Sequence, residues 1–255
     1  MNPLEYDVAG EGRSVVIALH GNFASKRFYQ DLIKKPIYRH RMIAPNLPGF
    51  GGSTYTGAPT IAAFADILEE FFTTLKLEQP VLIGHSFGGA LALELAVRQP
   101  QKYCAIALIS SPSLTGFPYN IAADAVREQL KTDRALLEKI FDAQAPSLTT
   151  ARKLEINWQA ILDDAQNLES RIGNGIAADL GRWNRLEHAA KLLSVPILVF
   201  GGAHDVLVTP AMTQEIIQQI PHAKLEIEPS AGHWLPLEQP EFLRTQLEHF
   251  LEEIP

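Results

Sequence analysis

The chain has 255 residues, of which 46% are hydrophobic and 20% are charged, and its formal net charge is −7. These values predict one globular domain, or a domain with an insertion, and exclude a disordered or fibrous chain. The mild acidity and the lack of a Lys/Arg cluster argue against a nucleic-acid partner, and the single cysteine excludes an internal disulfide.

The beginning of the chain has no basic-then-apolar signal, and no apolar run reaches transmembrane length. We therefore expect a cytoplasmic protein without a membrane partner, either a monomer or a homodimer. Cys104 falls in the strand-like run 103–111, where we expect a buried and small apolar side chain.

In the first half of the chain, apolar strands alternate with helices of clear periodicity. The strands are predicted at 14–21, after His40, at 80–86 and at 103–111, and the helices at 60–75 and 88–99.

The alternation stops between Pro112 and Ala190, where no strong strand is evident. A short helix around 136–141 and an apolar stripe from Leu154 to Leu168, closed by Gly173 and Gly175, predict a helical insertion.

After the insertion the alternation resumes, with strands predicted at 195–202 and 223–229 and helices at 210–220 and 240–253. The chain is thus predicted to form an α/β fold, with a mostly parallel sheet covered by helices on both faces. Ligands of such sheets bind beyond the carboxyl ends of the strands.

One serine occupies an unusual place in this pattern. The segment GHSFGG, at 84–89, puts Ser86 between a strand and a helix, with glycines around it. Such a turn is strained, and the glycines make the sharp bend possible. The G-x-S-x-G pattern in this context predicts an exposed nucleophile facing a helix N-terminus, and the alternative is a merely structural turn.

A serine nucleophile needs a base, and the base needs an anion to orient it. Among eight histidines, His233 lies between the last strand and the last helix, and Asp205 follows the preceding strand. Both positions are at the carboxyl edge of the sheet, so we predict Ser86, Asp205 and His233 as catalytic residues. The alternatives are a solvated loop histidine and a turn-forming aspartate, whereas His20 is expected to be structural and the side chain of His85 is expected to point away from that of Ser86.

Two backbone N–H groups are needed to stabilise the oxyanion that forms when a serine attacks a carbonyl. We predict the N–H of Phe87, directly after the nucleophile. The second donor comes from the loop HGNFAS at 20–25, where we favour Asn22 and keep Phe23 as the alternative.

Five segments together resemble the α/β-hydrolase fold superfamily: HGN at 20–22, PNLPGFGGS at 45–53, GHSFGG at 84–89, GGAHD at 201–205 and AGHW at 231–234. The resemblance implies an α/β-hydrolase core over 1–111 and 191–255 and a helical cap, or lid, over 112–190. It also implies acyl transfer to water through an ester on Ser86, with no cofactor and no metal. No metal-ligand spacing such as H-E-x-x-H occurs in the sequence.

Several branches of the superfamily are similar to this chain, namely esterases, carbon–carbon bond hydrolases and proline iminopeptidases. The loop HGNFA departs from the H-G-G-P-G-type loop of the iminopeptidases, which disfavours an aminopeptidase. HGN also resembles haloalkane dehalogenases, but those enzymes and the epoxide hydrolases of this fold use an aspartate nucleophile. A serine at position 86 therefore disfavours both.

The lid is expected to choose the substrate. Its arginines, Arg152, Arg171, Arg182 and Arg185, are expected to be solvated, and we predict an apolar pocket that includes Phe23, Trp158 and Trp234. The alternative for Trp158 is that it only packs the lid onto the core. The resulting prediction is a serine hydrolase of a small, apolar ester or lactone. Carbon–carbon hydrolysis on the same triad and a ligand receptor on a hydrolase scaffold are the alternatives.

Overall fold

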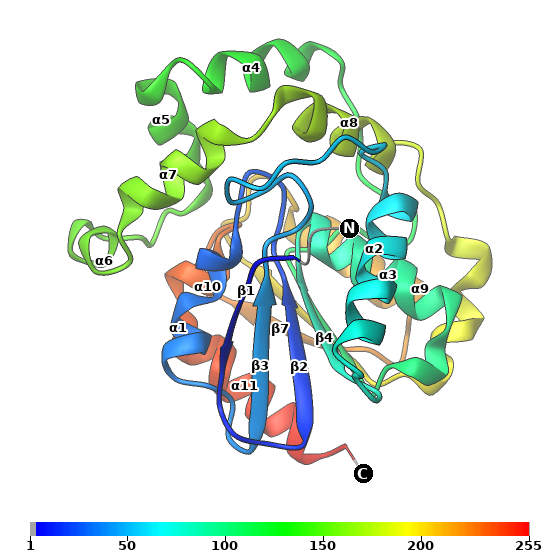
Figure 1. The fold of residues 1–255 in the computed structure, drawn as a ribbon. Helices are drawn as coiled ribbons and strands as arrows, with labels where there is room; N and C mark the ends of the chain where they lie inside the picture. Colours follow the sequence, from blue (N-terminus) through cyan, green and yellow to red (C-terminus); the bar gives the residue numbers. More distant parts are fainter. Residues whose placement is uncertain (1–3, 255) are drawn as a thin grey trace.

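A seven-stranded sheet forms the centre of the computed structural model, which describes residues 4–254 (Figure 1). The strand order is β1-β3-β2-β4-β5-β6-β7, in which β1 pairs antiparallel with β3 and the other neighbours pair in parallel. The strands are β1 (Tyr6–Ala9), β2 (Ser14–Leu19), β3 (His40–Pro45), β4 (Val81–His85), β5 (Ile106–Ile109), β6 (Ile197–Gly202) and β7 (Lys224–Glu228). The mostly parallel sheet predicted from the sequence is confirmed.

Helices cover both faces of the sheet, as predicted. In Figure 1, α2, α3 and α9 lie on one side, and α1, α10 and α11 lie on the other. These helices are α1 (Gln30–Lys34), α2 (Ile61–Thr74), α3 (Phe87–Arg98), α9 (Pro210–Gln219), α10 (Leu235–Glu238) and α11 (Pro240–Glu252), with 3-10 helices η1 (Lys26–Tyr29) and η2 (Pro100–Lys102).

Alternation along each strand builds one hydrophobic core per face. Val15, Ile17 and Leu19 of β2 belong to the cluster under α2 and α3, whereas Val16 and Ala18 belong to the cluster under α1 and α11. Since a strand buried on both faces needs apolar side chains at every position, the strands read as continuous apolar runs.

Five α-helices between β5 and β6 lie over the carboxyl ends of the strands, at the top of Figure 1. They are α4 (Ala122–Leu130), α5 (Arg134–Gln144), α6 (Thr150–Glu155), α7 (Trp158–Asn167) and α8 (Ser170–Leu180), and η3 (Leu186–Ser194) leads back to β6. We call α4 to α8 the lid helices. They occupy the segment 112–190 that we propose as a cap.

The stripe predicted from Leu154 to Leu168 is not one helix, and this prediction was wrong. Leu154 belongs to α6, where its side chain is 80% exposed. Asn157 interrupts the helix with φ 52°, and its side chain caps α7 by accepting the N–H of Ala160. A left-handed residue cannot continue a right-handed helix, so α6 and α7 are separate.

Gly173 and Gly175 were predicted to end the stripe, but they lie inside α8. A Cβ on Gly173 would lie 3.1 Å from the ring of Phe23, and one on Gly175 would lie 2.2 Å from Pro59. These glycines therefore let α8 approach the core closely.

The edge strand β1 was not predicted, because its four residues alternate between exposed and half-buried positions. Cys104 is half-buried, rather than buried, and precedes β5 by two residues. Among residues 4–254, no helix has the length and apolar character needed to cross a membrane.

Candidate active site

Ser86 forms the turn between β4 and α3, and the strain of the turn lies in Ser86 itself. Its dihedrals are φ 52° and ψ −118°, a region that residues with a side chain rarely adopt. A Cβ on Gly84 would lie 2.3 Å from the Gly88 oxygen, and one on Gly88 would lie 2.1 Å from the Leu19 oxygen. The neighbouring glycines thus leave room for close backbone packing, whereas we predicted that they permit the bend itself.

His233 and Asp205 form a buried hydrogen-bonded pair. His233 lies in the loop between β7 and α10, and its Nδ1 is 2.9 Å from Asp205 Oδ2. The other carboxylate oxygen, Oδ1, accepts the N–H groups of Leu207 and Val208, each at 2.8 Å. Because a carboxylate only accepts, Nδ1 carries the proton, and Nε2 is the nitrogen that can accept one.

The charge state of Asp205 follows from its surroundings. Burial by itself would raise the pKa of this carboxyl, but the His233 imidazole and the Leu207 N–H hold the pKa below its ordinary value. Asp205 is therefore ionised at neutral pH and can stabilise a protonated imidazole.

Ser86 and His233 line the same cavity, which has a volume of about 290 Å³. The lid helices α4, α5 and α8 contribute to its wall, and most of the lining side chains are apolar. The apolar members include Phe23, Phe28, Phe117, Val126, Leu130, Ile140, Phe141, Leu180, Leu207 and Trp234. Two of the three residues expected in the pocket, Phe23 and Trp234, are among them.

Trp158, the third, does not line the cavity, and this prediction was wrong. Its ring packs on the Trp234 ring at a centroid distance of 5.5 Å and on the Phe141 ring at 6.1 Å. Trp158 therefore supports two residues of the wall from behind. Helical periodicity shows that a residue is buried but not which neighbour covers it.

The loop after β2 passes directly beside the nucleophile. A Cβ on Gly21 would lie 3.0 Å from the Ser86 Cβ. The Phe23 N–H is already used, since it donates to Asn22 Oδ1 at 3.1 Å. The Asn22 N–H has no acceptor among residues 4–254, which favours Asn22 over Phe23 as the oxyanion donor. Phe87 is the first residue of α3, where N–H groups lack partners within the helix.

His20 holds this loop in place, in agreement with the structural role predicted for it. Its Nδ1 donates to the Gly21 oxygen at 2.8 Å, and its Nε2 accepts the Leu47 N–H at 3.0 Å. Burial lowers the pKa of His20 to about 4, so the ring stays neutral and keeps both bonds.

Two of the four lid arginines, Arg152 and Arg185, are anchored to the core by carboxylates, in contrast to our expectation, whereas Arg171 and Arg182 are exposed as expected. Arg152 pairs with Asp31 of α1, and Arg185 donates to the buried Glu94 of α3 at 2.8 Å. Arg171 donates to the Gly57 oxygen at 2.8 Å. Of the four, Arg182 alone keeps a mostly exposed side chain.

Arg127 of α4 lines the cavity and was not singled out in the sequence. Its Nε donates to Asn174 Oδ1 at 2.7 Å, and its Nη2 pairs with Asp124. No local signal marks this residue, because the sequence does not tell which face of a lid helix points toward the nucleophile.

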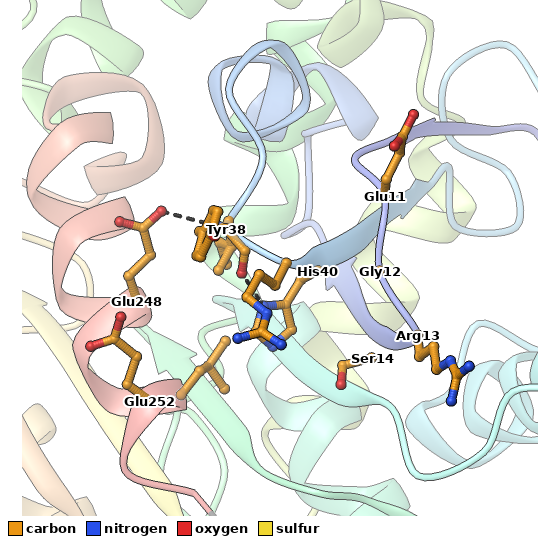
Figure 2. A pocket seen from close by; sticks show the side chains of 11 residues that line it. Glu11, Gly12, Arg13, Ser14, Tyr38, His40, Glu248 and Glu252 are labelled. Atoms are coloured by element: carbon orange, nitrogen blue, oxygen red, sulfur yellow. Dashed lines mark hydrogen bonds between the residues drawn. The ribbon is translucent and has the colours of Figure 1, made fainter.

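A larger depression, of about 680 Å³, lies at the opposite edge of the sheet, near the first residues of β2 and β3 (Figure 2). Charged side chains such as Arg13, Arg39 and Glu252 line it, and Glu248 accepts the Tyr38 N–H there at 3.2 Å. It contains none of the predicted catalytic residues. In the described part of the chain, no three His, Cys, Asp or Glu side chains are grouped as metal ligands.

Comparison with known proteins identifies the fold. A family model described as alpha/beta hydrolase fold matches residues 14–240. An sn-1-specific diacylglycerol lipase of Mus musculus is 24% identical, over 98% of this chain and 85% of the lipase. A 2-hydroxymuconate semialdehyde hydrolase of Pseudomonas sp. (strain CF600) is 28% identical, over 84% of this chain and 77% of that enzyme. Among solved structures, the enol-lactonase of Burkholderia xenovorans LB400 superposes with a TM-score of 0.84 at 19% identity, over 98% of this chain and 96% of that chain.

Proposed function

We propose, since the chain belongs to the α/β-hydrolase fold family, that it is a serine hydrolase of small, largely apolar carboxylic esters or lactones. One observation carries the proposal: Ser86, on its strained turn, and His233, paired with Asp205 at 2.9 Å, line the same apolar cavity. A strained residue and a buried, hydrogen-bonded His–Asp pair at one cavity are expected of a site built for chemistry rather than of a structural turn.

In the proposed reaction, His233 Nε2 takes the proton of the Ser86 hydroxyl while Oγ attacks the carbonyl carbon. The negative charge moves to the carbonyl oxygen, where the N–H groups of Asn22 and Phe87 stabilise it. His233 then gives its proton to the leaving alcohol, which departs and leaves an ester on Ser86. A water molecule, deprotonated by His233, attacks this ester in the same way, and the carboxylic acid leaves as Ser86 recovers its proton.

The cavity supports a small substrate with an apolar acyl group. Its volume, about 290 Å³, is at the lower end of the range of ligand pockets, and its wall is mostly aromatic and aliphatic. The one arginine in the wall, Arg127, is already paired with Asp124, so it adds little net charge to the site.

Ester cleavage needs only a nucleophile, a base with its orienting acid and two oxyanion donors, and candidates for each are present. The similarity to a diacylglycerol lipase also favours an ester bond. Carbon–carbon hydrolysis on the same residues is the second candidate, favoured by the similarity to a 2-hydroxymuconate semialdehyde hydrolase. Loss of the dienolate absorbance of such a substrate would support the second candidate, and turnover of esters alone would remove it.

The test is a panel of p-nitrophenyl esters and lactones of graded acyl length, assayed with the wild type and with Ser86→Ala. We expect hydrolysis of short acyl chains by the wild type and a rate near background for the variant. Ser14→Ala is the matched control. Ser14 is the first residue of β2, at the edge of the sheet opposite to the one where Ser86 lies, so this variant should keep full activity. Wild-type turnover by Ser86→Ala would refute the proposal.

A further inference from the structure

The backbone on both sides of the His233 side chain is held by distant parts of the chain. The His233 N–H donates to the oxygen of Gln144, at the end of lid helix α5, at 2.7 Å. The His233 oxygen lies 2.8 Å from Nε2 of His85, and because a carbonyl only accepts, His85 donates. Both partners are far from His233 in sequence, so the backbone of His233 is fixed by the fold and not by its own loop.

Glu238 holds the residues before and after His233. Its Oε1 accepts the N–H of Gly232 at 2.9 Å and the N–H of Trp234 at 3.2 Å. The residue is 7% exposed, and it stands at the end of the short helix α10. Burial raises the pKa of this carboxyl, whereas the hydrogen bonds that it accepts oppose the rise. A buried carboxylate surrounded by N–H donors is a strong acceptor, because bonds to an ionised group are short and directional.

The same carboxylate also reaches the lid. Its Oε2 accepts the backbone N–H of Ser147 at 3.1 Å and the Ser147 hydroxyl at 2.8 Å. Ser147 follows α5, so Glu238 joins the loop that carries His233 to the segment between lid helices α5 and α6. Two roles are therefore separable: Glu238 can act on His233 through Gly232 and Trp234, or it can act on the lid through Ser147.

We infer that Glu238 is a positioning residue for His233. By fixing the N–H groups of Gly232 and Trp234, it keeps the imidazole against Asp205 and at the wall of the cavity that Ser86 also lines. This inference rests on the proposed function, since it assigns the carboxylate a role only if His233 is the base. Glu238 was not predicted as a site residue, although a single acidic residue in the apolar stretch HWLPLE is a local signal of a buried partner.

The experiment compares Glu238→Gln with Ser147→Ala in the ester assay. In Glu238→Gln one acceptor oxygen becomes an NH₂ group that faces N–H donors, so the loop loosens. A displacement of about 1 Å at a catalytic group can lower the rate about 100-fold, so we expect kcat to fall about 10- to 100-fold with little change in KM.

We also expect the acid limb of the kcat/KM profile to move to lower pH. Asp205 and His85 lie against the imidazole, and Glu238 accepts the backbone N–H groups on either side of His233. The variant removes one negative charge near the ring and loosens the contact with Asp205. Ser147→Ala, which keeps the bonds to Gly232 and Trp234, should leave kcat and the pH profile nearly unchanged.

Glu94→Gln is the matched control, because Glu94 is also a buried carboxylate between lid and core, held by Arg185 and Trp183. We expect it to lower the unfolding temperature without moving the pH profile. Wild-type kcat and pH profile in a folded Glu238→Gln would overturn the inference, as would an equal loss in Ser147→Ala. If Glu238→Gln does not fold, Glu238→Asp replaces it, and an unchanged kcat in that variant overturns the inference too. Failure of the proposed function is a separate result, seen as wild-type turnover by Ser86→Ala.

Discussion

Replacing Asp205 by asparagine separates the chemical role of this residue from its structural one. The amide oxygen of Asn can still accept the N–H groups of Leu207 and Val208, which lie 2.8 Å from Oδ1. The amide NH₂ group then faces His233 Nδ1, where the carboxylate oxygen stood at 2.9 Å. An NH₂ group only donates, so Nδ1 must accept and the proton of the neutral ring must sit on Nε2.

In that tautomer His233 cannot take the proton of Ser86, and the imidazolium also loses its buried counter-ion. In triads of this kind, the same change lowers kcat about 10⁴-fold, which corresponds to about 5 kcal/mol of activation free energy. The Leu207 and Val208 bonds are kept, and the bond to His233 becomes a weaker one between neutral groups, so the free energy of unfolding should change by only about 1 kcal/mol.

The assay measures kcat and KM on a short-chain p-nitrophenyl ester, with the unfolding temperature as the control for folding. Asp205→Ala is the companion variant, because it removes the acceptor of Leu207 and Val208 as well and should destabilise the fold further. A folded Asp205→Asn that keeps more than about a tenth of the wild-type kcat would refute the role given to the carboxylate.

Three further predictions concern packing and pH. Gly88→Ala should destabilise the fold by about 3 kcal/mol or prevent folding, because its Cβ would lie 2.1 Å from the Leu19 oxygen. Gly52→Ala has open space around the new Cβ but a φ of +84°, so it should lower the free energy of unfolding, measured with a chemical denaturant, by only about 1 kcal/mol. Trp158→Ala should destabilise the fold by about 3–5 kcal/mol yet leave KM nearly unchanged, whereas Phe23→Ala should change KM. The pKa of Asp205 in the folded protein is lowered from 3.8, so ionisation of this carboxyl stabilises the fold, fully so above pH 3.8. This stabilisation should disappear as the pH falls through the folded-state pKa. The difference in unfolding temperature between the wild type and Asp205→Asn should therefore shrink over that pH range.

Local patterns in the sequence predicted the sheet and the turn at Ser86 well, for physical reasons. A strand buried on both faces needs an unbroken apolar run, as in β4, and a serine on a strained turn needs small neighbours, as at Gly84 and Gly88. Parallel strands bring their carboxyl ends to one edge of the sheet. The order of strands and helices in the sequence was therefore enough to predict that the loops carrying Asp205 and His233 lie at the same edge.

Contacts between distant segments could not be predicted in this way. The periodicity around Trp158 indicates burial, but only the fold shows that Trp234 lies between this ring and the cavity. Arg127 and Glu238 were missed because the role of each depends on partners that the sequence does not reveal: Asn174 on another lid helix for Arg127, and the loop that carries His233 for Glu238. The break at Asn157 was missed because a left-handed residue leaves the apolar spacing on either side nearly intact.

The most direct test of the central claim is to identify the residue that carries the acyl group. The enzyme is mixed with a p-nitrophenyl ester, quenched in acid during turnover, digested and analysed by mass spectrometry, with fluorophosphonate labelling as the stable analogue. We predict an acyl or phosphonyl group on Ser86 alone, absent from Ser86→Ala. Ester turnover with no adduct, or with the adduct on another residue, would contradict the account.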